Sequence, residues 1–109
     1  MKGKSMAKMM DMFKQASQMR KEMKRIQDAL EKHTVEYSNG GVTVVARGDM
    51  AIQSLTIAPE TFQTAKTEKL ERILLQNVNA ALKLAKRDAQ KMMSQATSGG
   101  GLAEMFGGG

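Results

Sequence analysis

Basic side chains recur at regular spacing near the start of this 109-residue chain. Lys14, Lys21, Arg25 and Lys32 are separated by 7, 4 and 7 positions. On a helix, side chains at these spacings line one edge, and Lys24 lies close beside them. Cationic groups along a rod suit phosphates, because duplex DNA presents one negative charge per ~1.7 Å of its axis. The spacing therefore favours DNA contacts at Lys14, Lys21, Lys24 and Arg25.

A second set of basic side chains lies in the later part of the chain. When residues 66–97 are placed on a helical wheel, every lysine and arginine falls on the side opposite a leucine- and alanine-rich face. These residues are Lys66, Lys69, Arg72, Lys83, Lys86, Arg87 and Lys91. The further candidates for DNA contacts are Lys83, Lys86, Arg87 and Lys91. Ile73, Ala80 and Leu84 share the basic side and indicate a second contact there, between subunits.

The net charge of +6 agrees with a polyanionic partner. The competing interpretation is a solvated surface, because charged faces on long helices usually serve solubility. Aromatic residues are scarce, which argues against single-stranded nucleic acid and favours duplex DNA. No helix-turn-helix spacing is visible, so the sequence offers no evident means of reading bases.

Enzymatic and metal chemistry has few candidate residues. The chain contains no cysteine and a single histidine, His33, which excludes thiolate zinc sites, disulfides and histidine-rich metal sites. His33 is expected to end the first helix, where a positive charge favours the helix dipole. Glycine-rich phosphate-binding motifs are also absent from the sequence. The sequence therefore predicts a protein that is not an enzyme and has no cofactor, metal or small-molecule substrate.

The first basic edge requires a long helix over residues 5–33. Apolar residues recur within it at spacings of 3 and 4, the heptad pattern of a helix that packs against a partner. At ~1.5 Å per residue this helix would be about 40 Å long, more than a small domain can cover. The partner is the second helix, another copy of the chain, or both. The core or dimer seam is expected to contain Met12, Met19, Met23, Ile26 and Leu30.

The middle of the chain has the alternation of β-strands. Residues 34–38 and 42–47 flank Asn39-Gly40-Gly41, which supplies the positive φ angles of a tight hairpin. A third strand over 51–58 ends at Pro59, and its change of parity between Ile52 and Leu55 predicts a bulge. A second long helix over 67–97 must cover this small antiparallel meander. The predicted fold is α+β, with one domain over residues 1–98.

Residues 99–109 contain six of the ten glycines and are expected to form a flexible Gly-rich tail. The sequence Leu102-Ala103-Glu104-Met105-Phe106 within it could bind a partner. An alternative function is therefore a protein–protein adaptor that uses the tail or the Met-rich seam. No apolar run reaches the ~20 residues of a membrane helix, and no signal peptide is evident, so we expect a cytoplasmic protein.

Several segments, taken in order, resemble the YbaB/EbfC family of bacterial nucleoid-associated proteins. They are FKQASQMRKEMKRIQ, NGGVTVVARGD, LTIAPETF and LERILLQNVNAA, followed by the Gly-rich end. The family often has aspartate where this chain has Ala58, and glycine where it has Asn39. Neither difference affects a candidate DNA contact.

The resemblance implies a homodimer whose paired helices project like tweezers and bind double-stranded DNA with little or relaxed sequence preference. It also implies a cytoplasmic, nucleoid-associated location, with roles in chromosome organisation, gene expression or repair. By position, the family's helical contacts correspond first to Lys14, Lys21 and Arg25. The next residues that correspond to these contacts are Lys83, Arg87 and Lys91.

Overall fold

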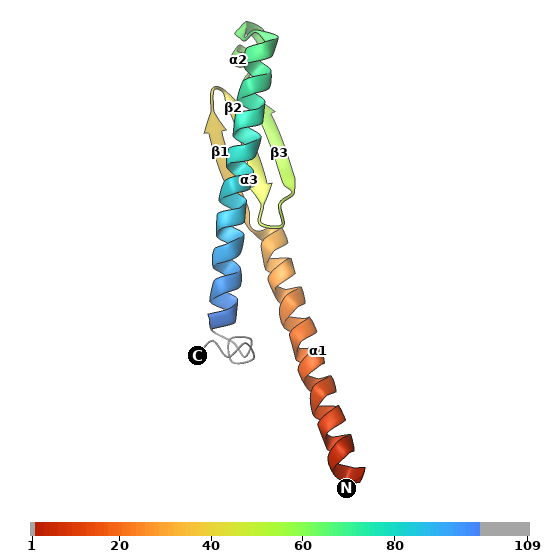
Figure 1. The fold of residues 1–109 in the computed structure, drawn as a ribbon. Coiled ribbons are helices and arrows are strands. Elements are labelled where there is room, and N and C mark those ends of the chain that lie inside the picture. Colours follow the sequence, from red (N-terminus) through yellow and green to blue (C-terminus); the bar gives the residue numbers. More distant parts are fainter. Residues whose placement is uncertain (1, 99–109) are drawn as a thin grey trace.

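The structure, a computed structural model, describes residues 2–98 and the side chains of residues 6–96. The predicted tail over 99–109 lies outside this range. The elements in chain order are α1 (Lys2–Lys32), β1 (Thr34–Asn39), β2 (Val42–Arg47), β3 (Ile52–Ile57), α2 (Pro59–Thr64) and α3 (Thr67–Ser98). The α+β class, the two long helices and the three-stranded antiparallel sheet are thus confirmed (Figure 1).

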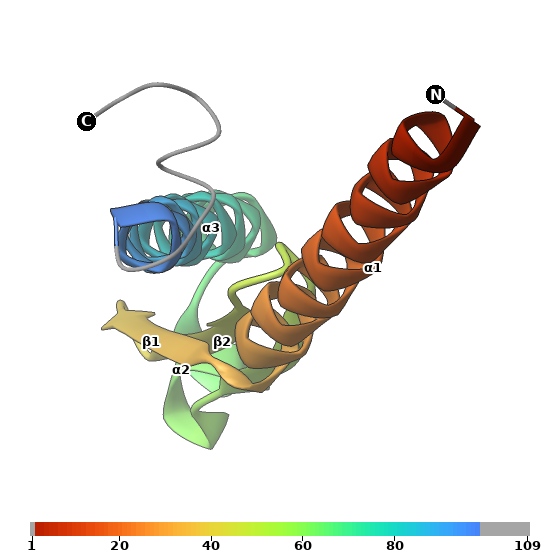
Figure 2. The ribbon, with the colours of Figure 1, turned by 90° about the horizontal axis from the view of Figure 1, so that it is seen from below.

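The molecule is elongated because most of α1 projects from the sheet (Figures 1 and 2). It extends over 79 × 23 × 18 Å, and its radius of gyration of 21.5 Å exceeds the ~13 Å of a compact domain of this length. The helix is rich in methionine, lysine, glutamine and alanine, which favour helices intrinsically. Its last turn closes where the His33 N–H donates to Ala29 O at 3.0 Å.

The sheet has the order β1-β2-β3, with both pairs antiparallel. Gly40 and Gly41 have φ angles of +64° and +84°, so the hairpin turn is the one that their sequence predicts. In the second pair, Ala46 lies opposite Ile52 and Val45 lies opposite Ser54, which leaves one extra residue in β3. The predicted bulge between Ile52 and Leu55 is therefore confirmed.

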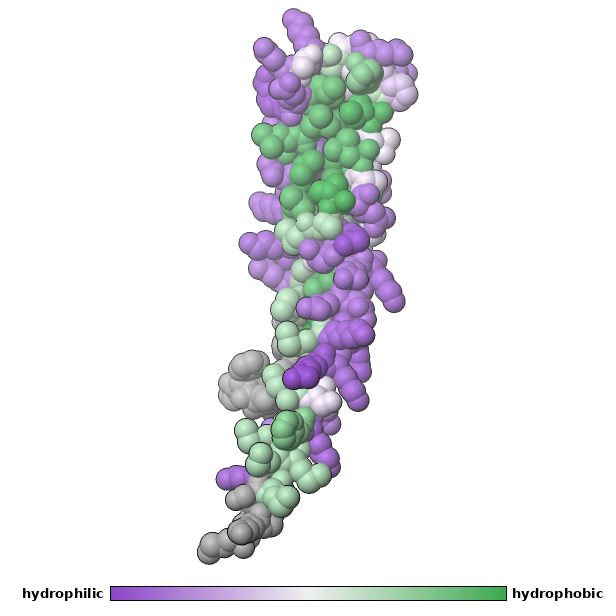
Figure 3. All heavy atoms as spheres, turned by 90° about the vertical axis from the view of Figure 1, so that its right-hand side faces the viewer, coloured by the Kyte–Doolittle hydropathy of each residue, from purple (hydrophilic) through white to green (hydrophobic). Residues whose placement is uncertain are grey.

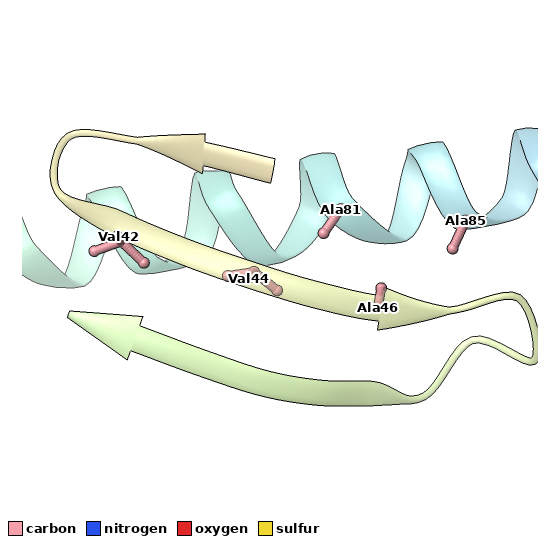
Figure 4. Close-up of a cluster of buried hydrophobic side chains, with 5 residues drawn as sticks. All are labelled: Val42, Val44, Ala46, Ala81 and Ala85. Atoms are coloured by element: carbon pink, nitrogen blue, oxygen red, sulfur yellow. The ribbon is translucent and has the colours of Figure 1, made fainter. Parts of the chain in front are cut away.

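The core forms where α3 crosses one face of the sheet (Figure 4). Val42, Val44 and Ala46 of β2 pack with Ala81 and Ala85 of α3, and all five are fully buried. Small alanine side chains on the helix allow its backbone to approach the strand closely.

Two local features differ from the sequence prediction. Pro59 ends β3 as predicted, but it also begins the short helix α2, where its missing N–H needs no helical partner. Ile73 was expected on the basic side of the second helix, in contact with another subunit. It packs instead within the chain, against the core and the hairpin turn at Gly40. The absence of a side chain at Gly40 leaves room for it.

Candidate nucleic-acid interface

The basic residues predicted on the first helix are all exposed on α1. Lys21, Lys24 and Arg25 line one shallow depression of about 500 Å³, together with Asp28, Ala29 and Lys32. Lys14 lies two turns further along the helix, about 10 Å from Lys21 along the axis. The structure thus brings three of these cations to one place and continues their edge toward Lys14.

The basic residues predicted on the second helix are exposed on the later half of α3. They are Lys83, Lys86, Arg87 and Lys91. Ala81 and Ala85 of the same helix are buried against the sheet. The four basic side chains lie on the part of the helix surface that faces solvent. Within residues 6–96, Arg87 is the one member of the two sets that forms an ion pair, at 3.4 Å between its Nη2 and Asp88 Oδ1. Its side chain remains 71% exposed.

The two helices lie close together near the sheet and diverge away from it (Figures 1 and 2). Arg25, Ile26 and Ala29 of α1 line a groove of about 170 Å³ with Met92 and Ala96 of α3. The α1 cations therefore lie on the part of α1 that projects from the sheet, whereas the α3 cations lie between the alanines that pack on the sheet and the groove. The other basic residues of the second set, Lys66, Lys69 and Arg72, occupy the start of α3 and the residue before it, at the opposite end of the molecule (Figure 1).

A hydrogen-bonded pair connects the end of α1 to α3. His33 Nε2 donates to Asp88 Oδ2 at 2.8 Å. This hydrogen bond is the main cause of the lowered pKa of the Asp88 carboxyl, and the charge of Arg87 lowers it further. From the sequence, His33 was expected to act on the helix dipole, and its partner Asp88 was not predicted. Asp88 is the single acidic residue of α3 after Glu71. Its isolated position was the one signal in the sequence that could have indicated a partner.

The middle of the chain contributes one arginine, and it is already paired. Arg47 donates from Nε to Asp49 Oδ1 at 2.9 Å and from Nη2 to Oδ2 at 2.5 Å. The hydrogen bond raises the pKa of Arg47 and lowers the pKa of Asp49. Among the described residues, the unpaired positive charge therefore lies on the two long helices and on Lys66, next to the start of α3.

The predicted seam on α1 has two different environments. Leu30 packs against Gly48 in the β2–β3 turn, and Ile26 faces α3 across the groove. Further out, Met19 is partly buried, whereas Met23 is 55% and Met12 66% exposed. The inner end of the seam packs within the chain, and its outer end has no apolar partner among the described residues.

A second exposed apolar surface, absent from the sequence prediction, lies on β3. Ile52 and Leu55 point to the same sheet face as their neighbours Ala46 and Val44, yet they are 39% and 43% exposed. A helix is about 10 Å wide and strands are about 4.8 Å apart, so α3 covers β1 and β2 but not the third strand. Figure 3 shows apolar side chains gathered over this part of the sheet, with others along α1 on the same side. Phe62 of α2 is also exposed.

The described residues offer little for two other kinds of function. Within residues 2–98 no three histidine or acidic side chains cluster as metal ligands would. No helix in the same range combines the length and apolar character that crossing a membrane requires.

Comparison with known proteins identifies similar chains. The profile of the YbaB/EbfC DNA-binding family matches residues 6–101. A nucleoid-associated protein of Ruminiclostridium cellulolyticum is 41% identical over 101 residues, covering 90% of this chain and 88% of the relative. Nucleoid-associated proteins of Acetivibrio thermocellus and Pelotomaculum thermopropionicum are 39% and 42% identical. The match to the Acetivibrio protein covers 88% of both chains. The match to the Pelotomaculum protein covers 87% of this chain and 86% of the relative.

Proposed function

Since this chain belongs to the YbaB/EbfC DNA-binding family, we propose that it binds duplex DNA through phosphate contacts on α1 and α3. The family is one of nucleoid-associated DNA-binding proteins and not of enzymes. The proposed contacts are Lys14, Lys21, Lys24 and Arg25 on α1, and Lys83, Lys86, Arg87 and Lys91 on α3. The observation that supports this most directly is that all eight side chains are exposed.

The geometry favours contacts to phosphates over contacts to bases. The cations lie along the axes of long, straight helices, and each reaches outward on a flexible side chain. Phosphate contacts position a protein on DNA but carry no sequence information directly. In the sequence, the three strands lie between α1 and α3. The two helices therefore do not form a helix-turn-helix that could insert a recognition helix. We therefore infer little sequence preference.

We further propose that two copies pair through the apolar surface that one copy leaves exposed. Ile52 and Leu55 on β3, with Met12 and Met23 on α1, supply that surface. Exposed apolar patches of this kind mark interaction sites, and a two-fold dimer buries the same patch on both partners. Pairing would double the basic edges and set two projecting helices beside one duplex, in a tweezer-like assembly.

The protein–protein adaptor hypothesis uses the same exposed methionines. An adaptor accounts for the outer seam but gives no role to the basic sets on both helices. A titration with salt separates the two functions, because counterion release lowers DNA affinity steeply as salt rises. We expect log affinity to fall linearly with log salt on two duplexes of unrelated sequence, and the oligomer mass measured alongside to be that of two chains. A slope near zero would refute phosphate binding.

A further inference from the structure

The groove between α1 and α3 is suited to a few apolar side chains. It has a volume of about 170 Å³, below the 300–1,000 Å³ of sites that hold small molecules. Apart from Arg25 its lining is apolar: Ile26 and Ala29 from α1, Met92 and Ala96 from α3. Ile26, Met92 and Ala96 are only partly buried, so an added apolar group would remove their remaining surface from water.

The chain itself provides a segment of matching chemistry next to this groove. Ala96 lies two residues before the end of α3, and the sequence continues from Ser98 as GGGLAEMFGGG. Leu102, Met105 and Phe106 are its apolar residues, and three glycines stand on each side of the LAEMF sequence. A short apolar sequence between glycine runs can bind a nearby surface without constraint from its flanks.

We propose that residues 102–106 of this chain bind in the groove between its own α1 and α3. Leu102 is the fourth residue after Ser98, the last residue of α3, and an extended chain of that length spans up to about 14 Å. The segment can therefore turn back to the groove lining within its reach. The three glycines after Ser98 allow the reversal, because glycine adopts positive and negative φ with similar ease.

Charge favours the same placement. Glu104 is the acidic residue of the segment. Arg25 and Ala29 line both the groove and the neighbouring depression that contains Lys21 and Lys24. A carboxylate held in the groove would face these cations. The segment would then compete with DNA phosphates for Arg25, a consequence that depends on the proposed function.

Engineered disulfides measure the docking directly, since the chain has no cysteine of its own. One variant of the full chain carries Ala29→Cys in the groove and Ala103→Cys in the segment. Its matched control carries Gln90→Cys with Ala103→Cys, because Gln90 is exposed on α3 and does not line the groove. A glutathione redox buffer gives the effective concentration of each thiol pair, which for a short flexible linker is in the millimolar range.

We expect the groove pair to have an effective concentration at least tenfold above the control pair. Adding Leu102→Ser and Phe106→Ser should bring the two values together. Equal values in the unmodified segment would overturn the proposal, and so would disulfides that join two chains when differently tagged chains are mixed. Duplex DNA should lower the groove value. If the groove pair is enriched in a protein that does not bind DNA, docking stands and the proposed function fails.

Discussion

The phosphate-contact proposal predicts that the position of the basic residues, and not only their number, sets the affinity for DNA. One variant loses two lysines and one arginine from the edge of α1, and its control loses the same residue types from the region of the α3 start. The first is Lys14→Ala/Lys21→Ala/Arg25→Ala and the second is Lys66→Ala/Lys69→Ala/Arg72→Ala. All six residues are exposed, so neither variant removes core packing.

The size of the effect follows from counterion release. Each phosphate that a protein neutralises contributes about 0.9 to the slope of log affinity against log salt, so three lost contacts reduce the slope by about 2.7 for each copy that contacts the duplex. If the three contacts contribute nothing at 1 M salt, this slope gives a loss of about 500-fold at 0.1 M salt and about 25-fold at 0.3 M for one copy. The control triple should leave the slope within about 1 of the wild-type value, because it changes net charge but not direct contacts.

Fluorescence anisotropy with two labelled duplexes of unrelated sequence measures both affinity and slope. Circular dichroism of each variant shows whether the helices remain. The loss should be similar on both duplexes, since phosphates are common to every sequence. If both triples weaken binding equally, net charge alone accounts for the affinity and the assigned edge is wrong. If the α1 triple affects only one duplex, the contacts read bases.

Three further predictions test the fold and the assembly. Asp88→Asn should lower the free energy of unfolding at neutral pH, because the native hydrogen bond lowers the pKa of Asp88. The difference from wild type, followed by urea denaturation, should persist above pH ~4 and disappear as the pH falls through the lowered pKa. Leu55→Ser should shift the sedimentation mass from two chains to one, whereas Val45→Ser on the opposite sheet face should not. Gly41→Ala should destabilise the chain by about 2 kcal/mol or more in urea, because φ is +84° and a Cβ would overlap Thr61.

The sequence was sufficient for the elements whose signals are local. Asn39-Gly40-Gly41 allows few structures other than a tight turn, because two consecutive residues there need positive φ. The apolar residues of β3 change parity at the point where the structure places the bulge. The exposure of the basic residues was predictable as well, since a lysine opposite buried alanines on one helix can only face solvent.

Features that depend on distances between elements could not be predicted in the same way. Alternation assigns Ile52 and Leu55 to the inner face of the sheet, but the width of one helix decides that they stay exposed. Asp88 resembles an ordinary surface carboxylate until the fold brings His33 to 2.8 Å from it. The heptad pattern indicates that α1 packs against a partner. It does not indicate how much of α1 is covered within one chain.

Under the proposed function, the exposed outer seam of α1 implies that DNA binding needs a second copy of the chain. Met12 lies about 27 Å from Leu30 along the axis of α1, beyond the reach of a sheet whose strands have six residues. Leu30 and His33 hold the helix at one end only, through Gly48 and Asp88. No contact to the other described elements holds the outer part of α1, so nothing within one chain fixes the spacing between its cations and those on α3. Contacts that a second copy makes to Met12 and Met23 would hold the outer end, so apolar pairing and phosphate binding belong to one mechanism.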